Sequence, residues 1–196
     1  MKKQLLIEHI SKYVKLSKNE VALIRSFLKL KKVRRKQLML EEMEIQKYGF
    51  FVISGCLKSY TLEKNGFERV LQFAPSGWWI GDMFSLKNQE PSRLYIDAVF
   101  DSEILLLSHL DLSNLYEMVP NLERCFRLLA ENAFAASQRR IIETVSLTAL
   151  ERYENFKTRY PDLFEQLPQK LIASYIGITP EFLSRVLREL SNDNLR

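Results

Sequence analysis

The sequence has little cysteine, no long apolar run and no recognisable catalytic motif, and each shortage excludes a class of protein. Its two cysteines, Cys56 and Cys125, lie far apart and form neither a disulfide framework nor a metal-ligand pattern. No run of 18 apolar residues occurs, so no membrane span is expected. The basic N-terminus has no signal-peptide core, which favours a cytoplasmic location. Paired carboxylates, a nucleophile–base set and a phosphate loop are not found, so we predict that the chain is not an enzyme.

Positive charge is concentrated near the N-terminus. Residues 1–40 contain twelve Lys and Arg but only two acids, for a charge of +10, whereas the remainder carries −5. The densest run, Lys29–Lys36, could contact phosphates or could be a solvated face that flanks a strand. We favour the solvated face, so the bulk charge gives weak support for nucleic-acid binding.

The expected secondary structure changes twice along the chain. Residues 4–30 have helical periodicity, with Ser17 and Glu20 as a capping box between two helices. From 32 to 108, short strands alternate with turns, and Asn65-Gly66 is the strongest hairpin signal. Strands spaced about 8–12 residues apart predict an antiparallel barrel, sandwich or roll. Residues 110–158 are helical again.

A long helix is predicted to begin at Pro120. Five of its apolar residues repeat at a spacing of four and three, which is typical of a coiled coil: Leu122, Phe126, Leu129, Ala133 and Ala136. Two heptads are also compatible with a helix that packs on its own domain, so periodicity leaves both interpretations open.

Residues 169–188 predict a helix-turn-helix. Gly177 supplies the turn between two amphipathic helices, and Ala173 lies where those helices cross. Thr179 is an N-cap, followed by Pro180 in the first helical position. The outward residues of the second helix are the candidate DNA contacts, namely Thr179, Glu181, Ser184, Arg185 and Arg188.

A strand-rich segment, a long helix and a C-terminal helix-turn-helix together resemble the Crp/Fnr family of bacterial transcription regulators. The resemblance is carried by FFVISGCLKSYTLEKNGFERVLQFAPSGWWIGDMFSL, DSEILLLSHLDLSNL and IASYIGITPEFLSRVLREL. It implies an α+β fold with a β-roll effector domain at 1–118, a dimerisation helix at 119–145 and a DNA-binding domain at 146–196. It further implies a homodimer that binds a palindromic promoter site and acts with RNA polymerase.

The resemblance is weakest at the effector site. The family's cyclic-nucleotide cassette has Gly-Glu, then Arg-Ser-Ala about ten residues later. Here Gly81-Asp82 follows Trp79, but the later pair is inverted to Ser92-Arg93. A buried phosphate needs a charge-assisted partner, so we expect an effector other than cAMP, with Ser137 near the family's base-contacting position. Two cysteines cannot ligate an iron–sulfur cluster, and His9 and His109 are interpreted as ordinary residues rather than haem ligands.

The second helix of the helix-turn-helix also departs from the family. The usual Ser-Arg-Glu-x-x-x-Arg is Thr179-Pro180-Glu181-x-x-x-Arg185 here, so Glu181 and Arg185 are kept and one arginine is lost. The sequence given ends where the family's wing begins, which predicts an incomplete wing. An alternative hypothesis is therefore a ligand-binding or protein-interaction module that no longer binds DNA.

Overall fold

The computed structural model describes residues 2–193, with side chains through Glu189. The chain forms two compact units. The N-terminal unit comprises Met1–Thr61 and Leu71–Asn132, and the C-terminal unit comprises Leu62–Val70 and Ala133–Arg196. The long helix α5 is thus divided between the two units, and the tip of the β4–β5 hairpin belongs to the C-terminal unit. The predicted domain boundaries at 118 and 145 include neither feature. The predicted truncation of the wing concerns the end of the chain, outside the described residues.

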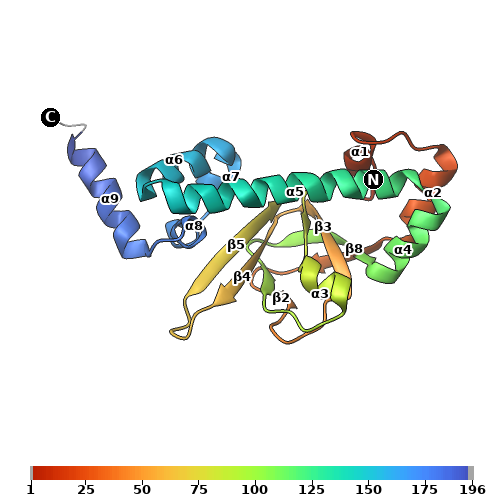
Figure 1. Ribbon diagram of the computed structural model, residues 1–196, viewed down its shortest axis with the longest axis horizontal. Helices are drawn as coiled ribbons and strands as arrows, with labels where there is room; N and C mark the ends of the chain where they lie inside the picture. Colours follow the sequence, from red (N-terminus) through yellow and green to blue (C-terminus); the bar gives the residue numbers. More distant parts are fainter. Residues whose placement is uncertain (1, 194–196) are drawn as a thin grey trace. The chain divides into compact units, whose positions relative to one another are not determined.

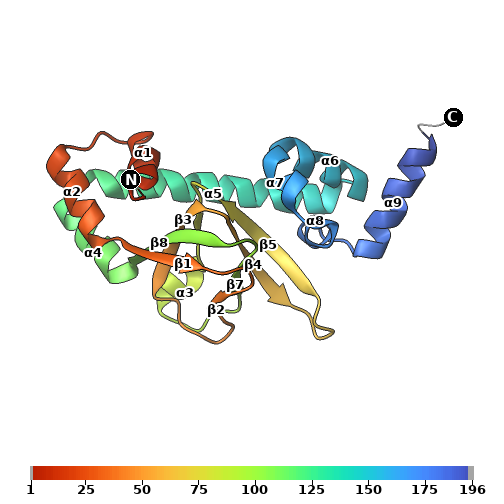
Figure 2. The same cartoon turned by 180° about the vertical axis from the view of Figure 1, so that it is seen from behind.

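The elements follow the predicted order of helices, strands and helices (Figures 1 and 2). They are α1 (Gln4–Ser11), α2 (Lys18–Phe27), β1 (Lys29–Val33), β2 (Leu38–Leu40), β3 (Tyr48–Ser54), β4 (Cys56–Leu62), β5 (Glu68–Pro75), β6 (Trp79–Ile80), α3 (Met83–Asn88), β7 (Tyr95–Ala98), β8 (Ser102–Ser108), α4 (His109–Met118), α5 (Asn121–Ser146), α6 (Ala149–Arg159), α7 (Pro161–Gln166), α8 (Gln169–Ile176) and α9 (Pro180–Asp193).

The strands form a roll of two four-stranded sheets. Their orders are β1-β8-β3-β6 and β2-β7-β4-β5, and β8 lies antiparallel between β1 and β3. The basic run predicted as a solvated face forms the edge strand β1 and the turn after it, where exposed lysines discourage pairing with another chain. Of the predicted fold classes, the structure therefore confirms the β-roll.

The first sheet is buried on both faces, because its side chains alternate between two cores. Phe50 and Ile104 point between the sheets, where they join the core with Leu57 and Ile96. Phe51 and Leu105 point the other way, into a second core under α1, α2, α4 and the first part of α5. Figure 1 shows these helices gathered at one side of the roll. Fully burying each such side chain contributes about 1.5–3 kcal/mol.

Local signals in the sequence fix the ends of several elements. Ser17 and Glu20 form the predicted capping box at the start of α2. Gly66 turns the β4–β5 hairpin with a φ of 79°, and the Asn65 side chain accepts a hydrogen bond from the Phe67 amide at 2.8 Å. The hairpin predicted at Asn65-Gly66 is confirmed.

We expect the N-terminal unit to lose stability in mild acid because of His9. Its ring packs against Tyr13 and Phe51, and burial, together with nearby Lys12, lowers its pKa from 6.5. Between the lowered pKa and 6.5 the unfolded chain binds more protons, so the free energy of unfolding falls as pH drops through this range. Urea titrations at pH 7.5 and pH 5 will measure the fall.

The variant His9→Phe keeps an aromatic ring but cannot titrate. It should show a smaller loss of unfolding free energy over the same pH range than the native chain. An equal loss in both proteins would show that His9 is not the responsible group.

Candidate functional site

The turn between α8 and α9 has the predicted geometry. Gly177 ends α8 with a φ of 82°, a left-handed conformation that glycine adopts without strain. The Ile178 amide donates back to the Ala173 carbonyl at 3.0 Å, and the Phe182 amide donates to the Thr179 hydroxyl at 3.2 Å. The first bond closes α8, and the second caps the N-terminus of α9.

The two helices bury one side of α9 and expose the other. Ala173 and Leu183 are 0% and 1% exposed, so a larger side chain at 173 would separate the helices. Every predicted DNA contact lies on the exposed side: Thr179, Glu181, Ser184, Arg185 and Arg188. The structure therefore brings these five residues onto one surface, which we call the reading face.

The residues of the reading face differ in whether their polar atoms form hydrogen bonds within α9. The Thr179 hydroxyl caps α9, and the Ser184 hydroxyl donates to the Pro180 carbonyl at 3.0 Å. These two hydroxyls thus already take part in bonds within the helix. Glu181 and Arg185 are exposed and lie one turn apart, so they can project together toward a ligand.

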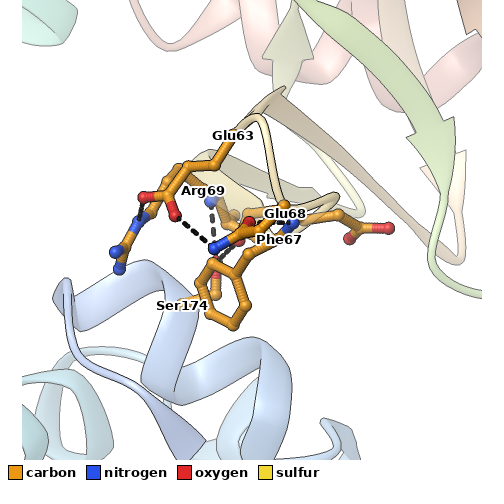
Figure 3. Close-up of polar contacts among 7 residues, drawn as sticks. Glu63, Phe67, Glu68, Arg69 and Ser174 are labelled. Carbon is orange, nitrogen blue, oxygen red and sulfur yellow. Dashed lines mark hydrogen bonds and ion pairs between the residues drawn. The ribbon is translucent and has the colours of Figure 1, made fainter.

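The hydroxyl of Ser174 holds the tip of the β4–β5 hairpin against α8, a contact that sequence reasoning missed. Ser174 accepts a hydrogen bond from the Val70 amide at 2.9 Å and donates one to the Glu68 carbonyl at 2.5 Å (Figure 3). An ion pair between Arg69 and Glu63 ties the two sides of the hairpin at 2.5 Å. The one signal in the sequence was a small polar residue among the apolar residues of α8. In the structure, this serine is 3% exposed.

Arg140 joins three segments of the C-terminal unit. From α5, its guanidinium donates to the Val70 carbonyl in the hairpin at 2.8 Å and to the Tyr175 carbonyl in α8 at 2.9 Å. Its guanidinium carbon lies 4.3 Å from the centre of the Tyr175 ring. Burial lowers the pKa of Arg140, and it raises that of Tyr175 to about 12, so the phenol is neutral at neutral pH.

The predicted effector residues of the roll form a closed structural cluster. Asp82 caps α3 by accepting from the amides of Phe84 and Ser85 at 2.9 and 3.2 Å. The Ser92 hydroxyl donates to the second Asp82 oxygen at 2.7 Å, and Ser92 is 0% exposed. The side chains at the family's acid and arginine positions therefore satisfy each other. Arg93 is exposed, so this pair supplies no buried cation for a cyclic phosphate.

The other predicted effector residues have different surroundings. Trp79 packs between Phe51 and Phe126, with ring centres 5.3 and 5.4 Å away, and so belongs to the core rather than to a cavity wall. Gly81 lies where a Cβ would come within 2.8 Å of the Gln46 amide. Ser137 is in the C-terminal unit, exposed, with its hydroxyl bonded to the Ala133 carbonyl at 2.9 Å.

The predicted dimer stripe of α5 is largely an internal face. Leu122 is 1% exposed, and Phe126 and Leu129 are partly buried against the same core of the N-terminal unit, so much of this part of the stripe is used within the chain. Periodicity shows that a face is apolar but not what covers it. Ala133 and Ala136 are exposed. A different set is both large and exposed: Phe134, Ile141, Ile142 and Val145, at 62–80%.

The thiols do not suit an iron–sulfur cluster. Cys56 and Cys125 are both buried, and burial raises their pKa values to about 12 and about 11, which disfavours the thiolate that ligates iron. His9 is packed against aromatic rings, and His109 is exposed at the start of α4. Within residues 2–193, no group of three or more His, Cys, Asp or Glu is placed to hold a metal ion. No helix in that range is both long and apolar enough to cross a membrane.

Comparison with known proteins agrees with this architecture. Residues 30–118 match the cyclic nucleotide-binding domain family. The fumarate and nitrate reduction regulatory protein of Vibrio cholerae is 26% identical over 172 residues, which cover 79% of this chain and 68% of the relative. These matches support an assignment of the chain to the Crp/Fnr family. The relative is named a regulatory protein, which agrees with a coarse role in transcription regulation.

Solved structures support the fold of this chain. The c-di-GMP-responsive global regulator CLP of Xanthomonas campestris matches with a TM-score of 0.73 at 16% identity, over 91% of this chain and 94% of that one. A protein from Eubacterium rectale assigned to the same family matches with a TM-score of 0.69 at 16% identity, over 91% and 85%.

Removing the Ser174 hydroxyl should loosen the hairpin. Ser174→Ala leaves the Val70 amide and the Glu68 carbonyl without their partner, at a cost of about 1–3 kcal/mol. Exchange of the Val70 amide with solvent, followed by NMR, should accelerate by roughly tenfold or more. Ser184→Ala, which removes an exposed hydroxyl bonded within its own helix, is the matched control and should leave that rate unchanged. Unaltered exchange in Ser174→Ala would rule out the hydroxyl as the tether.

Proposed function

We propose that this Crp/Fnr member is a homodimeric, effector-responsive transcription regulator that binds a palindromic promoter site through α9. The observation that carries the proposal is the reading face, where all five candidate contacts are exposed while Leu183 behind them is buried. The proposed partners are promoter DNA, a second copy of the chain and RNA polymerase.

Glu181 and Arg185 are the proposed base-reading pair. A guanidinium can bond O6 and N7 of guanine through two parallel N–H groups, and a carboxylate can accept from N4 of cytosine. Both side chains leave the first two turns of α9, the part of a recognition helix that enters the major groove. Arg188, Thr179 and Ser184 are assigned to phosphates or to a neighbouring base. Because Pro180 has no side-chain donor, the preferred half-site differs from that of relatives with arginine there.

Self-association is assigned to the exposed apolar face of α5. Phe134, Ile141 and Val145 recur at intervals of seven and four, which places them along one side of the helix. Large apolar side chains exposed in a row indicate an interaction site. A symmetric pair of such helices would present two reading faces to the two halves of a palindrome.

The effector of the roll is proposed to be a small molecule other than cAMP. Support comes from the cyclic nucleotide-binding domain match, which indicates a sensory roll, and from the Asp82–Ser92 bond, which occupies the groups that would hold ribose and phosphate. Effector binding would act by favouring one arrangement of the two reading faces over another.

Two variants of Arg185 separate base reading from charge. Arg185→Ala should weaken binding to DNA from upstream of the gene by about 1–3 kcal/mol and relax one base position. Arg185→Lys keeps the charge but loses the two-pronged geometry, so it should relax the same position with a smaller change in salt dependence. Fluorescence-anisotropy titrations at several salt concentrations will measure both effects.

Unchanged affinity and sequence preference in Arg185→Ala would remove this residue from the proposed base-reading pair. No DNA binding by the native chain at low salt would favour the alternative hypothesis of a ligand-binding or protein-interaction module.

The dimer face can be tested with charges on opposite sides of α5. Ile141→Glu places a charge within the apolar row and should shift the protein from dimer to monomer in sedimentation equilibrium. Ala136→Glu is equally exposed but lies on the far side of the helix from Ile141 and Phe134, so it should leave the dimer intact. A native chain that sediments as a monomer, or dissociation by Ala136→Glu alone, would contradict the assigned face.

A further inference from the structure

Phe182 is an exposed aromatic residue at the start of α9 and is not part of the reading face. It is 43% exposed, whereas its neighbour Leu183 is 1% exposed. Single apolar residues on a protein surface are common, so exposure alone does not indicate a function. The position of Phe182 on α9 and the residues beside it supply the further evidence.

The start of α9 places Phe182 at the third position of the helix. The Phe182 amide donates to the Thr179 hydroxyl at 3.2 Å, which makes Thr179 the N-cap and Pro180 the first helical residue. The N-terminal residues of a recognition helix are those that contact base edges. Helical side chains also lean toward the N-terminus of their helix, so the ring of Phe182 is directed toward the end of α9 that enters the groove.

Two other helices of the chain have glutamate at the position where α9 has Phe182. At the third position, Glu20 of α2 and Glu151 of α6 each accept a hydrogen bond from the amide of the N-cap residue and so complete a capping box. Phenylalanine has no acceptor for that bond, and its helix propensity is lower than that of glutamate. The first turn of α9 therefore lacks a local stabilising interaction, a departure that is expected where a residue serves binding.

Phe182 lies beside the proposed base-reading pair. It follows Glu181 directly and precedes Arg185 by three positions. Residues three apart on a helix are neighbours, with Cβ atoms about 5–6 Å from each other. Successive bases of a DNA strand are about 3.4 Å apart. The ring of Phe182 can therefore reach a base within about two base pairs of the guanine that Arg185 is proposed to read.

We propose that Phe182 selects thymine by packing its ring against the C5-methyl group in the major groove. Thymine is the base that presents a methyl group there, and apolar side chains, phenylalanine among them, recognise it by contact. The contact removes both the methyl group and the exposed ring from water. This role of Phe182 rests on the proposed DNA-binding function and deepens it, because it adds a base that Glu181 and Arg185 do not read. Each half-site accordingly contains a thymine within about two base pairs of that guanine.

Deoxyuridine tests the contact, because it pairs as thymine does but lacks the methyl group. The duplex is one that the native full chain selects from a random-sequence pool, and each of its thymines is replaced in turn. Fluorescence-anisotropy titrations at one salt concentration measure the affinity. Replacement of one thymine in a half-site, near the position that Arg185→Ala relaxes, should weaken binding by the native chain about fourfold, as expected for one buried methyl group.

Two variants assign the effect to the ring. Phe182→Ala should bind the thymine and deoxyuridine duplexes equally, because no ring is left to contact the methyl group. Phe84→Ala is the matched control: it removes an exposed aromatic ring from α3 in the roll and should keep the native preference for thymine. An undiminished preference for thymine in Phe182→Ala, or its loss in Phe84→Ala, overturns the assignment.

The native chain alone also decides the matter, whether or not Phe182→Ala folds. A selected half-site with no thymine near the guanine of Arg185, or equal affinity for the thymine duplex and every deoxyuridine duplex, overturns the role of Phe182 and leaves the proposed function standing. A native chain that selects no duplex contradicts the proposed DNA binding itself, and the role of Phe182 with it.

Discussion

One guanidinium determines the arrangement of the C-terminal unit. Arg140 donates to a carbonyl of the β4–β5 hairpin and to a carbonyl of α8, and its plane lies against Tyr175. The Tyr175 carbonyl lies in the last turn of α8, where backbone carbonyls lack partners within the helix. Helix α9, which presents the reading face, packs against α8. Arg140 and the hydroxyl of Ser174 in turn connect α8 to the β4–β5 hairpin.

The roll combines a tightly packed first sheet with a loop whose polar side chains bond to each other. Its first sheet is buried on both faces, which leaves little room for variation at Phe51 or Ile104. The loop that would hold a cyclic phosphate is less constrained, and here Asp82 and Ser92 have become partners in a helix cap. A carboxylate that already accepts three hydrogen bonds is poorly suited to receive a ribose hydroxyl. The effector of this member is accordingly proposed to differ from cAMP.

How much could be read from the sequence depended on whether the deciding interaction was local. The Gly177 turn, the Asn65-Gly66 hairpin and the Ser17–Glu20 capping box involve residues within five positions of one another, and all three were predicted. Long-range partners were not: Ser174 meets residues 104 and 106 positions away, and Arg140 meets Val70. The stripe through Leu122 and Phe126 was identified as apolar, but α5 has two apolar faces, and only the structure shows which one its own core covers.

The central claim is that two copies of this chain read DNA together through α9. Selection of bound duplexes from a random-sequence pool by the purified protein at low salt tests it most directly. The account predicts enrichment of an inverted repeat whose half-sites lie about 10 base pairs apart, one helical turn, as two symmetric reading faces require. Enrichment of a single unrepeated motif, or no enrichment at all, would contradict it.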